Sequence, residues 1–193
     1  MSAAPCPLSP DTDSRFWLPR SALSACVRAI LTRSTLAAQL SPAQRLNHLP
    51  ATPLCSLTWW FEGCAHILPP GRTGVEPLPT EPPLPRLLWA GPLSRPITSW
   101  NPGPVHSLTL LLTPDAMQQL SGLAASDWVN RWTDARTLLP PDWLPLCEAL
   151  FEPAGDDARI ARLQDFLAPR WQAVRPVLPL QAQRYLDWAR ALA

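Results

Sequence analysis

The residues of this 193-residue chain that could bind a metal ion are five cysteines and three histidines. The closest spacing is Cys64-Ala65-His66, where a strand would place the thiol and the imidazole on one face. Zinc takes three or four ligands, usually closely paired in sequence, and the other two histidines are distant. We therefore predict core thiols beside one polar histidine, with no bound metal and no cofactor.

Other reaction chemistries lack their usual motifs. The seven glycines are spread singly, without a phosphate-binding Gly-x-Gly-x-x-Gly or P-loop pattern. All 16 basic residues are arginine, which excludes Schiff-base chemistry on a lysine. Serine, histidine and aspartate are present, but no Gly-x-Ser-x-Gly nucleophile turn occurs. The sequence therefore predicts a protein that is not an enzyme.

Tryptophan is the unusual feature of the composition, with ten residues. Indoles from several predicted strands could line a cavity for a small apolar or aromatic ligand, and a carboxylate beside them could bind a cationic or hydroxylated group. The alternative is ordinary core packing, with the carboxylate at a strand end. The candidate pocket residues are Trp59, Trp60, Glu62, His66, Trp89, Trp100 and His106.

Strand-like patterns fill the first part of the chain. Residues 54–61 alternate most clearly, so Cys55, Leu57 and Trp59 should share one face. The proline-rich segment 69–86 should be a loop, because proline removes the amide donor. The compact turn 101–104 predicts a hairpin between its flanking strands. The expected strands cover residues 25–32, 54–61, 64–68, 86–91, 97–100 and 105–112.

After residue 112 the apolar period becomes helical. Thr113 before Pro114 is a strong start, and Gly122 is placed to end that helix. Further helices should begin near residues 126, 141, 156 and 180, and the one at 156 should end before Pro169. Strands followed by about five helices predict an α+β fold with an extended arm over 1–23, strands over 24–112 and a helical region over 113–193, to which the family resemblance given below assigns dimerisation and linker roles.

The helix at 156–168 is the best candidate for a dimer interface. Its apolar stripe of Ile160, Leu163 and Leu167 is continuous, and its other face is charged. The alternative is that the stripe packs on the chain's own strands.

Composition limits the partners and the compartment. Apolar residues make up 47% of the chain and the formal net charge is +1, so neither a basic nucleic-acid surface nor a helix-turn-helix pair is evident. Residues 1–20 lack the apolar core of a signal peptide, and no apolar run is long enough to cross a bilayer. We expect a cytoplasmic protein with reduced thiols.

Three segments together resemble one family. They are residues 47–63 (NHLPATPLCSLTWWFEG), residues 91–106 (GPLSRPITSWNPGPVH) and residues 110–116 (LLLTPDA) with Gly122. Their order and spacing are similar to the N-terminal regulatory domain of AraC-type transcription regulators, and the resemblance covers about residues 24–192. It implies a cupin-like antiparallel β-barrel, helices that pair two protomers, and DNA binding through a C-terminal domain absent here.

The resemblance makes an effector-sensing and dimerisation domain our first hypothesis, with a homodimer and a small-molecule effector as partners. Two alternatives stay open. A cupin-type metal enzyme would bring His48, His66 and His106 together on one ion. A naturally shortened interaction protein would instead heterodimerise with a full-length regulator.

Overall fold

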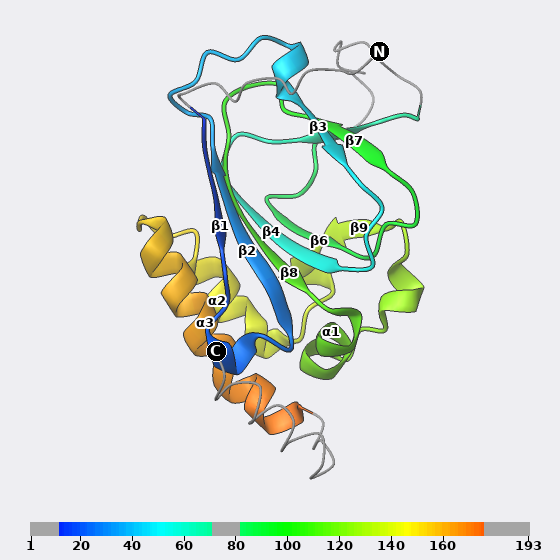
Figure 1. The fold of residues 1–193 in the computed structure, drawn as a ribbon, viewed down its shortest axis with the longest axis vertical. Helices are drawn as coiled ribbons and strands as arrows, with labels where there is room; N and C mark the ends of the chain where they lie inside the picture. The colour runs from blue at the N-terminus through cyan, green and yellow to red at the C-terminus, as the bar shows by residue number, and fades with distance from the viewer. Residues whose placement is uncertain (1–11, 71–81, 176–193) are drawn as a thin grey trace, which may run out of the picture.

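The computed structural model describes residues 12–70 and 82–175. Nine strands form two antiparallel sheets within these residues (Figure 1). The larger sheet has the order β1-β2-β8-β4-β6-β9, and the smaller sheet has the order β3-β7-β5. The strands are β1 (Asp13–Trp17), β2 (Val27–Ser34), β3 (Leu46–Leu49), β4 (Cys55–Glu62), β5 (His66–Leu68), β6 (Leu87–Ala90), β7 (Ile97–Trp100), β8 (His106–Leu112) and β9 (Trp132–Asp134).

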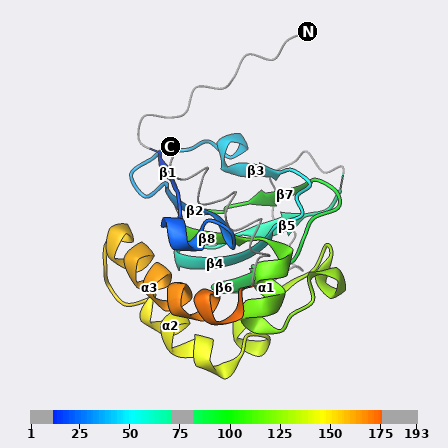
Figure 2. The ribbon, with the colours of Figure 1, turned by 60° about the horizontal axis from the view of Figure 1, so that its bottom comes forward.

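The described residues form three layers (Figure 2). The larger sheet lies in the middle, the smaller sheet lies on one of its faces and the helices cover the other. The predicted cupin-like barrel is therefore wrong, because the two sheets are separate in the described part of the chain. The part of the helical region that the structure describes, up to residue 175, also differs from the expected set of about five helices. It holds three α-helices: α1 (Pro114–Ser121), α2 (Leu144–Ala149) and α3 (Asp156–Val174).

Alternation along β4 was predicted correctly and sets which face forms the main core. Cys55, Leu57 and Trp59 are fully buried under the helices. Leu57 lies opposite Leu110 of β8, so the helix-covered face continues into the neighbouring strand. Side chains alternate between the two faces of a strand. The observed pairing of β4 with β8 therefore places the apolar residues of both strands in the same core.

The hairpin predicted across residues 101–104 does not form. β7 pairs with β3 and β5, whereas β8 pairs with β2 and β4, so the turn carries the chain from one sheet to the other. Asn101 is 3% exposed at this crossing. Its side chain donates to the Cys64 carbonyl at 2.9 Å and accepts from Asn47 at 2.7 Å. These buried contacts anchor the crossing to the smaller sheet.

Helix α1 confirms the predicted signals at both ends. The Thr113 hydroxyl accepts a hydrogen bond from the Ala116 amide at 3.4 Å, and Gly122 ends the helix with a left-handed φ of 76°. The helix expected from 126 to 132 is only a 3-10 turn, Ala125–Trp128, and Trp132 instead begins β9. The helix expected from residue 180 lies outside the described residues.

The predicted starts of α2 and α3 agree with the structure, but the predicted end of α3 does not. A 3-10 turn at Pro141–Trp143 leads into α2, close to the predicted start at 141. Helix α3 begins at Asp156 as predicted, but it continues through Pro169 to Val174. Proline inside a helix costs about 3 kcal/mol. Trp171, two residues further along, is 6% exposed, and burial of this large side chain offsets that cost.

Shorter elements complete the described structure. The strand β1 lies within the 1–23 segment predicted as an arm, and it pairs with β2 along its length. Three more 3-10 turns lie between the larger elements, at Ser21–Leu23, Ala43–Arg45 and Ala135–Thr137.

Candidate functional site

The tryptophans predicted to share a pocket lie in different layers. Trp59 and Trp89 are fully buried beneath the helices, and the Trp59 indole donates to the Cys147 carbonyl at 3.1 Å. Trp60 points to the opposite face of β4, and Trp100 lies in the smaller sheet with its ring centroid 6.1 Å from that of His66. Trp59 and Trp89 therefore lie on the opposite side of the larger sheet from Trp60, and the four indoles do not line one cavity.

The three histidines are also separated. His48 on β3 lies 3.2 Å from the Thr98 hydroxyl, His66 is beside Trp100, and His106 lies 3.0 Å from a carboxylate oxygen of Asp156. Glu62 is opposite His106 in the sheet, next to an irregularity in the β4–β8 pairing. Among the residues that the structure describes, no three metal-ligating side chains gather into a group.

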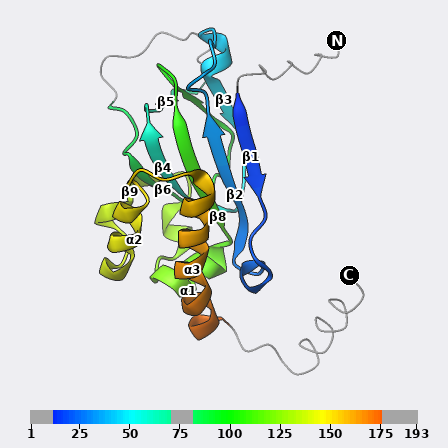
Figure 3. The same ribbon diagram turned by 90° about the vertical axis from the view of Figure 1, so that its left-hand side faces the viewer.

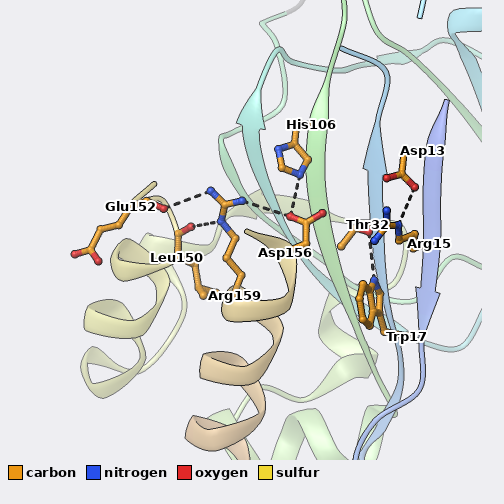
Figure 4. Close-up of polar contacts among 9 residues, drawn as sticks. All are labelled: Asp13, Arg15, Trp17, Thr32, His106, Leu150, Glu152, Asp156 and Arg159. Atoms are coloured by element: carbon orange, nitrogen blue, oxygen red, sulfur yellow. Dashed lines mark hydrogen bonds and ion pairs between the residues drawn. The ribbon is translucent and has the colours of Figure 1, made fainter. Parts of the chain in front are cut away.

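A polar cluster links the sheet to the start of α3 (Figure 4). The guanidinium of Arg159 donates to the Leu150 carbonyl at 3.0 Å and to the Glu152 carbonyl at 3.3 Å, and it lies 3.4 Å from Asp156. It also lies 3.8 Å from the centre of the Phe61 ring. Because Arg159 is buried, these contacts replace its lost hydration, and the cluster is well suited to fixing α3 on the sheet.

A pocket of about 640 Å³ opens where the outer strands of the two sheets approach each other. Ile67 and Ile97 come from the smaller sheet, and Trp132 comes from the edge strand β9 of the larger one. Prolines form much of the remaining wall. The described lining residues are Ile67, Leu68, Pro69, Pro70, Pro82, Leu84, Arg95, Pro96, Ile97, Thr98 and Trp132.

Arg95 gives this pocket its charge. Its side chain is exposed, and it makes no ion pair within the described residues. A guanidinium beside an apolar wall suits an anion with an apolar or aromatic body. Sequence reasoning missed both Arg95 and Trp132 as site residues. Trp132 was assigned to a helix, and Arg95 had no signal beyond its place in the segment 91–106.

The cysteines provide no activated nucleophile among the described residues. Burial raises the pKa of Cys26 and of Cys55 to about 11, and that of Cys147 to about 12. It also raises the pKa of the partly exposed Cys64. Thiols with raised pKa values stay protonated near neutral pH and react slowly.

The stripe predicted as a dimer interface lies inside the chain's own core. Ile160 is 4% exposed, and Leu163 and Leu167 are fully buried against the sheet. A partner subunit could not reach these three side chains while α3 keeps this position.

No family model, curated protein or solved structure matches this chain. The helices that the structure describes are all too short or too polar to cross a membrane.

Proposed function

We propose that this chain is the effector-sensing and dimerisation domain of a bacterial, cytoplasmic transcription regulator of the AraC type. DNA binding then belongs to a domain outside this sequence. The observation that carries the proposal is the mostly apolar pocket that Arg95 and Trp132 both line. The three sequence segments that resemble AraC-type regulators supply the regulatory context.

The size and lining of the pocket fit a small-molecule site. Ligand pockets commonly have volumes of about 300–1,000 Å³, with mostly apolar walls and a few polar groups that orient the ligand. Here prolines, isoleucines and leucines form the wall, while Arg95 and Thr98 supply polar groups. We infer an effector that has an apolar body and one negative charge.

The position of Trp132 offers a route from the pocket to the helices. Strand β9 ends at Asp134 and leads directly into the turn that contains Arg136. The Arg136 guanidinium donates to Glu148 of α2 at 2.6 Å and 3.3 Å. A ligand that shifts β9 would therefore move a charge anchored on α2, which is one physical basis for sensing.

Binding of 1-anilinonaphthalene-8-sulfonate tests the proposal, because this dye combines an aromatic body with a single sulfonate. We expect saturable dye fluorescence with the native protein and at least about tenfold weaker binding after Arg95→Gln, since about 1.4 kcal/mol corresponds to a factor of ten. Arg131→Gln removes another exposed arginine outside the pocket and serves as the matched control. Equal dye affinity for Arg95→Gln and Arg131→Gln would overturn the pocket as the effector site.

A further inference from the structure

The strand β1 forms one edge of the larger sheet (Figure 3). It pairs with β2 on one side, and its described residues Asp13 to Phe16 are all exposed. Phe16 is 63% exposed and Leu18, just beyond the strand, is 77% exposed. Exposed edge strands with large apolar side chains readily pair with another strand, and proteins usually protect such edges.

Charges along this edge are arranged in a self-complementary way. Asp13 and Arg15 lie on the same face of β1, and the Arg15 guanidinium donates to the Asp13 carboxylate at 3.0 Å. An antiparallel pair of identical strands related by a two-fold axis through Ser14 would place Asp13 opposite Arg15 of the partner subunit. Two acidic and two basic groups would then alternate across the junction, and opposite charges on facing strands stabilise a sheet.

We propose that β1 is a self-association surface and that its occupant is β1 of a second copy of this chain, paired antiparallel about Ser14. This inference rests on the proposed dimerisation and names its surface. The pairing would place Phe16 opposite Thr12 of the partner subunit, an aromatic and β-branched combination that is favourable across strands. The neighbouring register about Arg15 would instead bring two arginines face to face, which is unfavourable.

The arrangement differs from a helix-mediated dimer. The stripe Ile160, Leu163 and Leu167 is buried within the chain, whereas the edge of β1 is accessible. Joining two β1 strands would make the larger sheets of both copies continuous while leaving α3 in place.

Charge reversal tests the pairing. Light scattering after size exclusion should show a dimer for the native chain. Asp13→Arg alone and Arg15→Asp alone should each raise the dimer dissociation constant at least about tenfold, because each variant would place four like charges at the junction. A mixture of the two variants should recover a heterodimer, since one strand is then basic and the other acidic.

Two further variants keep the test independent of folding. Asp127→Arg reverses an exposed charge outside β1 and should leave the dimer unchanged. Phe16→Lys alters an exposed side chain that no core packing requires, and it should weaken the dimer while circular dichroism stays native.

The outcomes separate this inference from the proposed function. A monomeric native chain would overturn self-association altogether, while dye binding in the pocket could still hold. A native dimer that Asp13→Arg, Arg15→Asp and Phe16→Lys all leave intact would overturn the β1 surface alone. Failure of the mixed variants to pair, when each single variant is a folded monomer, would overturn the register about Ser14.

Discussion

The imidazole of His106, the first residue of β8, lies 3.0 Å from the carboxylate of Asp156, the first residue of α3. These residues are 50 positions apart in sequence. Their side chains are 19% and 25% exposed, so the contact is only partly screened by water. It joins the sheet to the helix that closes the core.

A double-mutant cycle should measure this contact. We expect His106→Ala and Asp156→Ala to show a coupling energy of about 1 kcal/mol in urea unfolding, because each substitution removes one partner of the same hydrogen bond. Asp157→Ala, the neighbouring exposed aspartate, should show no coupling to His106→Ala. Equal coupling in both cycles would contradict the assigned pairing.

Arg159 should contribute more to the free energy of unfolding than a surface arginine does. Arg159→Met removes donors from the carbonyl groups of Leu150 and Glu152, and we expect the free energy of unfolding to fall by about 2–3 kcal/mol. Arg162 is three residues further along α3, with a side chain 48% exposed, so Arg162→Met should cost less than about 1 kcal/mol. Denaturant unfolding compares the two variants, and similar losses would argue against a buried structural role for Arg159.

Leu163 tests which way the α3 stripe faces. Because Leu163 is fully buried, Leu163→Ala should lower the free energy of unfolding by about 2–5 kcal/mol. Val174 lies on the same helix but is 40% exposed, and Val174→Ala should change stability by no more than about 0.5 kcal/mol. Leu163→Asp should unfold the chain. A folded Leu163→Asp monomer would show that the stripe faces a partner subunit.

Two glycines provide a matched pair. A Cβ atom at Gly91 would lie 2.2 Å from the Trp128 carbonyl oxygen, whereas one at Gly103 would meet no atom within 4 Å. We therefore expect Gly91→Ala to cost about 1–3 kcal/mol through overpacking, and Gly103→Ala to cost much less. Thermal unfolding of both variants checks this, and equal melting temperatures would contradict the close approach of Gly91 to the Trp128 backbone.

Stability should fall in alkaline solution because of the buried thiols. The pKa of Cys147 is raised from 9.0 to about 12, so above about pH 9 the unfolded chain loses this proton while the folded chain keeps it. The free energy of unfolding should therefore decrease as pH rises from about 9 to 12. The chain has no lysine and one tyrosine, so few groups other than the cysteine thiols titrate in this range.

Urea unfolding at a series of pH values from 8 to about 11 measures that slope. Cys147→Ala should make the slope shallower than in the native chain, because it removes one thiol whose pKa changes on folding. The control is Cys64→Ala, since Cys64 is only partly buried. If Cys64→Ala reduced the pH dependence of the free energy of unfolding more than Cys147→Ala does, the larger pKa shift assigned to Cys147 would be contradicted.

Local patterns in the sequence determined several elements correctly. Alternation along residues 54–61 identified the strand and the face that carries Leu57 and Trp59, because side-chain direction in a strand depends only on position. Thr113 and Gly122 marked the two ends of α1, because capping groups satisfy backbone atoms within the same turn. These features need no information about distant residues.

Strand pairing was decided only by the tertiary structure. The turn after Trp100 suggested a hairpin, yet Asn101 anchors it to Cys64 and Asn47, and the next strand joins the other sheet. The same non-local choice kept the two sheets separate in the described residues and brought Arg95 to the pocket that contains Trp132. Hydrogen bonds between strands join residues far apart in the chain, so periodicity identifies a strand but cannot select its neighbour.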